Sequence, residues 1–143
     1  MIGEAEAALL DRSRVAHLAT AALDGTPHVV PLCYARDGDA IYFIVDEKPK
    51  QAGKRLKRLR NIAENPAVAL VVDVYDEDWD RLEYLLVQGR ATTVADAAEF
   101  AHVLGLLRAR YPQYRAMRLD LGRNELVRIT PVKVHHWRSN PTS

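Results

Sequence analysis

The sequence has few of the residues on which several common kinds of site depend. Cysteine occurs once among the 143 residues, at Cys33, so no disulfide can form within the chain, and a reducing compartment suits the protein. Serine occurs only at positions 13, 139 and 143, which leaves no convincing nucleophile for a serine triad. The sequence contains no glycine-rich dinucleotide or Walker fingerprint, and no set of His, Cys and carboxylate residues has metal-ligand spacing. Any redox chemistry therefore has to come from a bound cofactor.

Long apolar runs and a strong excess of one charge are also missing. Apolar runs such as Ala67–Val72 are far too short to cross a bilayer, and no basic segment precedes a long apolar core near the N-terminus. We therefore expect a cytoplasmic protein without a signal peptide and without a membrane partner. The formal net charge of +1 argues against a general nucleic-acid binder, which usually has a strongly basic surface. The charge is unevenly placed, however, because residues 48–60 are basic and residues 73–80 are acidic.

The apolar pattern and the turn signals predict a single domain over residues 1–143, with a tail from about 138 to 143. Asp24-Gly25 and Asp37-Gly38 are hairpin signals, and Asn65-Pro66 ends a helix. Because hairpins join most of the five or six strands, we expect a mainly β, antiparallel barrel decorated with three helices. The predicted helices cover residues 3–14, 53–64 and the stretch capped by Asp96, and the predicted strands cover 15–21, 27–35, 40–45, 67–73, 82–94 and 125–137, the last interrupted by Pro131.

A basic segment follows the third predicted strand and enters the next helix. Lys48 and Lys50 precede this helix, and Lys54 and Arg55 lie in its first turn. Cationic side chains beside a helix N-terminus, with its backbone N–H groups, can bind a phosphate. From charge alone a solvated helix face is the commoner outcome, but the position directly after an apolar strand favours phosphate binding.

Other polar residues are less suited to chemistry. Cys33 and His28 lie five residues apart in one predicted strand and so face opposite ways, which argues against a nucleophile–base pair. The adjacent His135 and His136 should also point apart. The acidic stretch lacks the glycine and the distant glutamate of a calcium loop, so we interpret it as a solvated loop. Trp79 is the exception within it, because an isolated tryptophan in a polar loop often docks against another surface.

Four segments together resemble one known family. They are VAHLATAALDGTPHVVPLCY at 15–34, IYFIVDEKPK at 41–50, RLRNIAENPAVALVVD at 58–73 and VQGRAT at 87–92. Their order resembles the pyridoxamine-5'-phosphate-oxidase-like split β-barrel family of flavin- and deazaflavin-binding proteins, from about Val15 to Trp137. The stretch VDVYDEDWDRLEYLLVQGRA is most similar to a subgroup thought to use the deazaflavin coenzyme F420.

The resemblance implies a homodimeric split barrel with the cofactor at the subunit interface. The ring would lie along the second and third strands, and the phosphate would contact basic residues after them. Tyr84 falls where a polar residue of the fifth strand contacts the cofactor in related oxidases, and Trp137 falls near the partner-derived side of the pocket. The implied cofactor-binding residues are thus His28, Val29, Val30, Pro31, Ile44, Val45, Asp46, Lys48, Lys50, Arg55, Tyr84 and Trp137, with no metal.

Two departures from the oxidase pattern narrow the function. That pattern has arginine at the start of the second strand and lysine at its end, where this chain has His28 and Cys33. This argues against vitamin B6 oxidation and favours F420 over FMN. We expect an oxidoreductase that transfers a hydride between the cofactor ring and a small organic substrate, with His28 and Tyr84 as candidate proton donors and no assigned catalytic residue. The alternatives are an FMN-binding oxidoreductase, a non-catalytic cofactor carrier, and a heme-binding relative with a histidine ligand.

Overall fold

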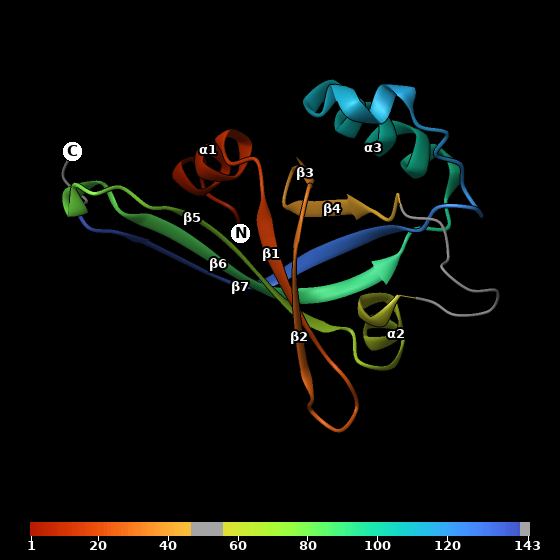
Figure 1. The fold of residues 1–143 in the computed structure, drawn as a ribbon, viewed down its shortest axis with the longest axis horizontal. Helices are drawn as coiled ribbons and strands as arrows, with labels where there is room; N and C mark the ends of the chain where they lie inside the picture. Colours follow the sequence, from red (N-terminus) through yellow and green to blue (C-terminus); the bar gives the residue numbers. More distant parts are fainter. Residues whose placement is uncertain (47–55, 141–143) are drawn as a thin grey trace.

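The computed structural model describes residues 1–46 and 56–140, and the elements follow the predicted order along the chain (Figure 1). In these residues no helix has the length and apolar composition that crossing a bilayer requires. The elements are α1 Glu4–Arg12, β1 Ala16–Ala21, β2 Pro27–Leu32, β3 Ala35–Asp37, β4 Ala40–Ile44, α2 Lys57–Glu64, β5 Ala67–Val74, β6 Glu83–Thr93, α3 Ala97–Arg110 and β7 Leu126–Arg138, with 3-10 turns η1 Trp79–Arg81 and η2 Pro112–Ala116.

The strands form one antiparallel sheet of seven strands in the order β2-β1-β5-β6-β7-β4-β3, which confirms the predicted antiparallel barrel architecture. The strand predicted over residues 27–35 is in fact two strands, because the chain leaves β1 after Leu32 and pairs with β4 from Ala35. Between them the Tyr34 N–H donates to the Tyr111 hydroxyl at 3.2 Å, and the Tyr34 hydroxyl donates to the Leu10 carbonyl at 2.6 Å. The segment thus crosses from one sheet edge to the other, and the sheet curls into a half-barrel.

The concave face of this sheet, called here the inner face, holds the larger apolar core. Helices α1 and α2 cover it from two sides through Leu9, Leu10, Leu59 and Ile62, all nearly or fully buried. Leu59 and Ile62 are the buried apolar residues of α2. A buried polar contact adds specificity, since the Asn61 amide of α2 donates to the Thr20 hydroxyl of β1 at 3.0 Å.

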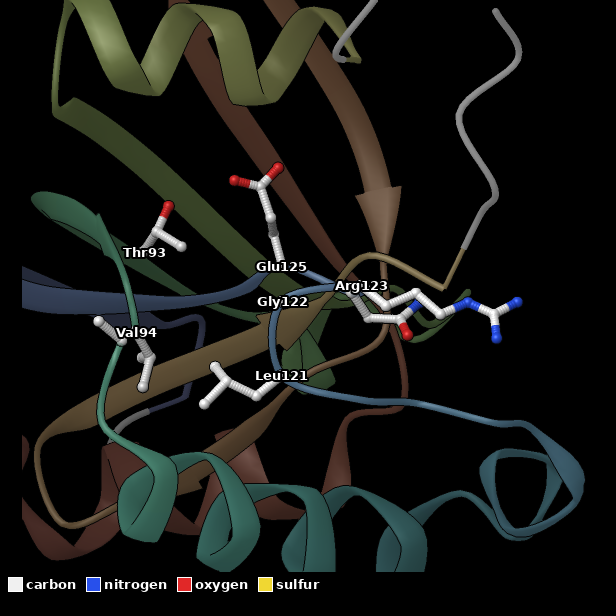
Figure 2. Close-up of a pocket in the computed structure, with 8 residues that line it drawn as sticks. Thr93, Val94, Leu121, Gly122, Arg123 and Glu125 are labelled. Atoms are coloured by element: carbon white, nitrogen blue, oxygen red, sulfur yellow. The ribbon is translucent and has the colours of Figure 1, made fainter. Parts of the chain in front are cut away.

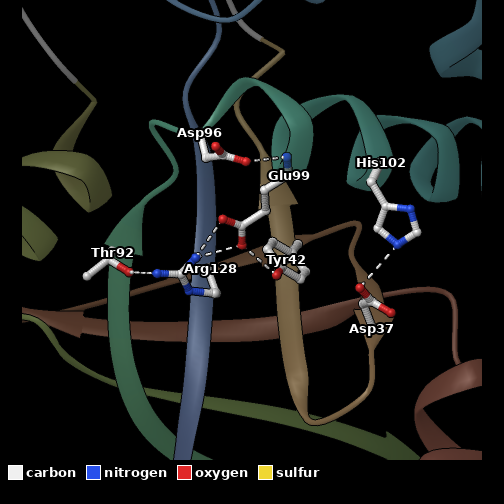
Figure 3. Close-up of polar contacts among 7 residues, drawn as sticks. All are labelled: Asp37, Tyr42, Thr92, Asp96, Glu99, His102 and Arg128. Atoms are coloured by element: carbon white, nitrogen blue, oxygen red, sulfur yellow. Dashed lines mark hydrogen bonds and ion pairs between the residues drawn. The ribbon is translucent and has the colours of Figure 1, made fainter.

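Helix α3 packs on the opposite, outer face of the sheet, over β3, β4 and the start of β7. Its predicted cap is confirmed, because the Asp96 side chain accepts a hydrogen bond from the Glu99 N–H at 2.8 Å. Figure 3 shows how Glu99 then fastens the helix to the sheet: its carboxylate accepts from the Tyr42 hydroxyl at 2.7 Å and from the Arg128 guanidinium at 2.6 Å. A second, smaller apolar cluster fills the space between α3 and the sheet.

The predicted interruption of the last strand at Pro131 is a β-bulge. Gln88 pairs with Lys133 while Gly89 pairs with Pro131, so Val132 is an extra residue on β7. Past the bulge β5, β6 and β7 continue as a long arm that ends at the turn around η1 (Figure 1). Arg138 and Ser139, which we expected at the start of a tail, extend this arm: Arg138 pairs with Glu83, and the Ser139 N–H donates to the Leu82 carbonyl at 3.0 Å.

The strand register also shows which side chains share the rest of the outer face. Among the described residues no helix packs over this part, which we call the open face. It consists of alternate residues from five strands: Pro27, Val29 and Pro31 of β2, His17, Ala19 and Ala21 of β1, Ala67, Ala69, Val71 and Asp73 of β5, Tyr84, Leu86, Gln88 and Arg90 of β6, and Lys133, His135 and Trp137 of β7.

Candidate cofactor site

Strand β2 is an edge strand, and this decides how a ring can contact it. In the described part of the chain β2 pairs only with β1, so its other edge carries backbone N–H and C=O groups with no strand beside them. Two of its residues, Pro27 and Pro31, lack an N–H, which an edge strand tolerates and a central strand does not. The remaining backbone groups can hydrogen-bond a planar ring whose rim carries donors and acceptors.

The predicted ring-binding residues of β2 alternate between the two faces of the sheet. His28 and Val30 are paired with the inward-facing Thr20 and Leu18 and share the inner face, whereas Val29 and Pro31 belong to the open face. A ring lying flat on either face would touch only every second residue. At the free edge a ring would meet backbone groups instead, again from alternate residues of the run 28–31, because the N–H and C=O groups of the other residues point toward β1.

His28 has an unmet hydrogen-bonding group beside this edge. Its Nδ1 atom is fully buried and has no hydrogen-bond partner among the described residues. The hydroxyl of its cross-strand neighbour Thr20 accepts from the Asn61 amide and forms no hydrogen bond with this atom. Leaving a buried polar atom unpaired costs roughly 1–3 kcal/mol, so such atoms often mark a site whose ligand completes them. The position therefore fits a bound cofactor.

The predicted contacts at the end of β4 differ from one another. Ile44 and Val45 are each 5% exposed and lie in different clusters, Ile44 under α3 and Val45 in the inner core. Their side chains therefore serve packing, and only their backbone is available to a ligand. Asp46, directly after them, is exposed.

A cluster that the sequence did not predict joins the ends of β2 and β4. Burial raises the pKa of the Tyr114 hydroxyl, and the nearby Cys33 thiol and Asp46 carboxylate raise it further. The hydroxyl thus keeps its proton at any physiological pH. Tyr114 lies in η2, between α3 and β7, and an aromatic residue three positions after Tyr111 was the only signal for it in the sequence. Cys33 is half-buried.

Tyr84 and Trp137 are brought together by the structure but lie away from β2. They are cross-strand neighbours on the open face of the arm, with ring centroids 5.8 Å apart, and His135 lies 5.7 Å from Tyr84. His136 points to the inner face, where its Nε2 lies 2.7 Å from Glu83, so the two adjacent histidines do point apart. Tyr84 is three strands from β2 in the sheet, or roughly 14 Å at the usual strand spacing. One chain therefore does not place Tyr84 and Trp137 beside the β2 edge.

The predicted phosphate-binding residues Lys48, Lys50 and Arg55 lie outside the described residues. The adjoining part of the basic segment is described, and there Lys57 and Arg60 are exposed on α2. In residues 1–46 and 56–140, no three His, Cys, Asp or Glu side chains converge as a metal site would require.

A pocket of about 480 Å³ adjoins the end of β4 (Figure 2). Asn124 links it to that strand by donating to the Val45 carbonyl at 3.1 Å, while the Val45 N–H donates to the Glu125 carbonyl at 2.9 Å. In Figure 2 the Arg123 side chain points away from Thr93 and Glu125. Of the predicted cofactor residues that the structure describes, none lines the pocket, whose wall is Thr93, Val94, Ala95, Leu121, Gly122, Arg123, Asn124 and Glu125.

The curled antiparallel half-barrel with an unpaired β2 edge and an open outer face is a split-barrel fold. The sequence matches the family model described as pyridoxamine 5'-phosphate oxidase over residues 2–138, and the chain belongs to that family. None of the curated proteins is similar enough in sequence to match it.

Solved structures share the fold. A conserved hypothetical protein from Mycobacterium tuberculosis is 24% identical with a TM-score of 0.77, and the alignment covers 97% of this chain and 86% of that one. A structure described as an F420 reductase is 28% identical with a TM-score of 0.61, covering 90% and 94% of the two chains. The heme storage protein HutZ from Vibrio cholerae is 14% identical with a TM-score of 0.71, covering 96% and 94%.

Proposed function

We propose that the protein is an oxidoreductase that binds coenzyme F420 in preference to FMN and passes a hydride between the cofactor ring and a small organic substrate. The observation that carries the proposal is the free edge of β2 with the unpaired, buried Nδ1 of His28 beside it. The similarity to a structure described as an F420 reductase supports the choice of cofactor.

The chain's own residues would bind and orient the cofactor. The backbone of residues 28–31 and the segment ending at Asp46 would hold the ring, and Lys48 and Lys50, helped by Arg55, would hold the phosphate. When bound, the ring supplies the hydride donor or acceptor. The Tyr114 hydroxyl joins His28 and Tyr84 as a candidate proton donor, because it stays protonated and is close enough to Cys33 and Asp46 to be influenced by their charge.

The proposed functional unit is a cytoplasmic homodimer with the cofactor at the seam. Within one chain Tyr84 and Trp137 lie too far from the β2 edge to share a ring with it, as argued above from the strand order. A second copy packed on the open face supplies these aromatic residues to the site of the first. Exposed apolar residues such as Val29 (64% exposed) and Trp137 (42%) give that contact its hydrophobic area.

A second candidate, non-catalytic heme binding, rests on a different observation. His17 and His135 are both exposed on the open face, on one row of the sheet that also contains Val71 and Leu86. Histidine is a common heme ligand, and an apolar row between two histidines suits a flat macrocycle. The similarity of fold to the heme storage protein HutZ supports this alternative.

A visible spectrum and two titrations test the proposal. F420 and FMN are titrated in parallel at one salt concentration with fluorescence as the readout, and heme is titrated by its Soret band. We expect F420 to bind at least tenfold more tightly than FMN, since the chain lacks two basic positions of the oxidase pattern, and each charge-assisted contact contributes roughly 1.5–3 kcal/mol. FMN binding tenfold tighter than F420, or a specific heme spectrum without binding of either flavin, would contradict it.

The Lys50→Ala variant localises the phosphate in the same titration. Loss of one charge-assisted contact should weaken F420 binding by roughly one to two orders of magnitude while the melting temperature stays unchanged. The matched control is Lys57→Ala, which removes an exposed lysine from the same basic segment. Equal and small effects in the two variants would show that the segment acts only as a diffuse positive surface.

A further inference from the structure

Three rings lie together on the open face of the arm. Tyr84 of β6 and Trp137 of β7 are cross-strand neighbours, with their ring planes within 30° of parallel and their centroids 5.8 Å apart. His135 of β7 adds a third ring, 5.7 Å from Tyr84. In the described ranges these rings belong to neither apolar cluster, and Trp137 remains 42% exposed. We call Tyr84, His135 and Trp137 the ring platform; its rings are available to a ligand.

A carboxylate lies beside this platform. Asp73 of β5 is directly opposite Tyr84 in the ladder, so their Cβ atoms are roughly 5 Å apart, and both belong to the open face. Asp73 is exposed, and in the described part of the chain no cationic side chain pairs with it. Arg81, in the turn beyond β5, pairs with Asp78 at 3.5 Å instead. The Asp73 carboxylate can therefore meet a cation supplied by a ligand.

The cationic residues of β7 do not neutralise this end of the face. Lys133 lies on the open face but four residues before Trp137, or roughly 13 Å along the strand. Arg138 follows Trp137 directly, but it pairs with Glu83 in the register and so belongs to the other face of the sheet. An anionic ligand on the platform would thus meet Asp73 without a compensating cation beside it.

The rings and the carboxylate together select one chemical class of ligand. The face of an aromatic ring attracts a cation, and it also stacks on another flat ring. Rounded ammonium groups are usually bound in aromatic cages, whereas the platform takes its three rings from two adjacent strands of one sheet face. A flat ligand that carries a delocalised positive charge can use both the rings and the carboxylate.

We propose that the ring platform binds a small planar organic cation, such as an N-alkylated nitrogen heterocycle, with its positive charge beside Asp73. One chain contains every residue of this site, so the binding requires neither the cofactor nor a second copy. In the proposed function Tyr84 and Trp137 face the cofactor ring, and a ligand between the two is held for hydride transfer. The class of the small organic substrate would then be a planar cation, an extension that rests on the proposed function.

The test is a fluorescence titration of the cofactor-free protein. The chain has two tryptophans, so the Trp79→Phe variant leaves Trp137 as the only one, and its quenching reports binding at the platform. The probe is the N-methylquinolinium cation, and 4-methylquinoline, uncharged at pH 8, is its neutral counterpart of equal size. We expect saturable quenching by the cation and an affinity for the neutral probe that is at least about fivefold lower.

Two substitutions in the Trp79→Phe background separate the charge from the rings. Asp73→Asn should weaken binding of the cation about three- to fivefold and leave the neutral probe unaffected. Tyr84→Leu should weaken binding of both probes, because both stack on the ring, by about threefold to tenfold. The matched control is Glu64→Gln, which removes the same charge from an exposed position on α2, away from the arm (Figure 1), and should change neither affinity.

Three results would overturn the proposal: quenching that rises linearly without saturation, equal affinities for the two probes, or equal effects of Asp73→Asn and Glu64→Gln. Asp73 is exposed on its strand, so Asp73→Asn still decides the matter if Tyr84→Leu fails to fold. The F420 and FMN titrations are separate measurements. A failure of this site therefore leaves the proposed function standing, and a failure of cofactor binding leaves this site standing but withdraws the assignment of the substrate.

Discussion

The outer face of the sheet is closed at one end and open at the other, although β6 and β7 run through both. At the closed end Tyr42, Ile44 and Leu126 lie under α3 and are at most 5% exposed. At the open end Val29 and Trp137 are 64% and 42% exposed. At both ends the side chains of each strand point alternately to the two faces of the sheet. The difference in exposure therefore comes from helix α3, which covers the closed end only.

This comparison separates residues that stabilise the monomer from residues available to a ligand or a second copy. At the closed end each apolar side chain has its partners within the chain, and the Glu99 contacts fix the helix in place (Figure 3). At the open end the largest apolar side chains have no helix over them in the described ranges. Apolar area that a single chain leaves exposed is favourably buried in an interface.

The largest expected difference in stability is between two variants, each with one apolar residue truncated, at the closed end and at the open end of the outer face. Leu107 of α3 is fully buried, so Leu107→Ala should lower the free energy of unfolding by roughly 3–5 kcal/mol through lost burial and a cavity. Val29→Ala should change the stability of the monomer by less than about 0.5 kcal/mol. Denaturant unfolding measures both free energies at a protein concentration well below the dissociation constant of the dimer. Equal losses would show that the open face is packed within the monomer after all.

The sequence predicted the order of the elements because hairpin signals and apolar periodicity are local. It did not predict the break after Leu32, because that break depends on Tyr34 bonding to Tyr111 and Leu10, far away in the sequence. Pro131 correctly marked an irregularity in the last strand. The bulge also reverses the alternation of β7, so that even-numbered residues face outward before it and odd-numbered residues after it. Only the pairing with β6 reveals that change.

The second-largest effect on stability is expected at the β-bulge between β6 and β7, which lies between the closed and the open end of the outer face. A Cβ at Gly89 would lie 2.5 Å from the Thr130 carbonyl oxygen, which is backbone and cannot move aside without distorting the ladder. Gly89→Ala should therefore cost roughly 2–3 kcal/mol of stability and alter the course of the arm. Gly105→Ala is the control, because a Cβ there meets nothing within 4 Å on an exposed helical position and should stabilise by about 0.5–1 kcal/mol. The two melting temperatures should thus move in opposite directions.

The candidate site was less predictable than the fold. The resemblance indicated residues 28–31 as a run, and the structure shows that their side chains alternate between the two faces of the sheet and that β2 has a free edge. Tyr114 was missed because its contact with Cys33 joins segments far apart in the sequence. Ile44 and Val45 were named by their position along the strand, and the structure buries their side chains in the two apolar clusters. The apolar alternation in the sequence of a strand indicates which residues are buried, but it does not indicate which face of the sheet a ligand occupies.

The smallest expected effect on stability tests the Glu99 contacts at the closed end. Hydrogen bonds from Arg128, and then from Tyr42, lower the pKa of the Glu99 carboxyl below its ordinary value of 4.5. A carboxyl whose pKa is lower in the folded state stabilises the fold above the unfolded pKa, and this contribution is lost as the pH falls through the folded value. Glu99→Gln should therefore cost roughly 1–2 kcal/mol at pH 7, a figure reduced for partial exposure, and the gap to wild type should narrow toward pH 3. The control Glu64→Gln, on an exposed position of α2, should show no such gap. A gap that stays constant from pH 7 to pH 3 would mean that Glu99 acts through shape and not through its charge.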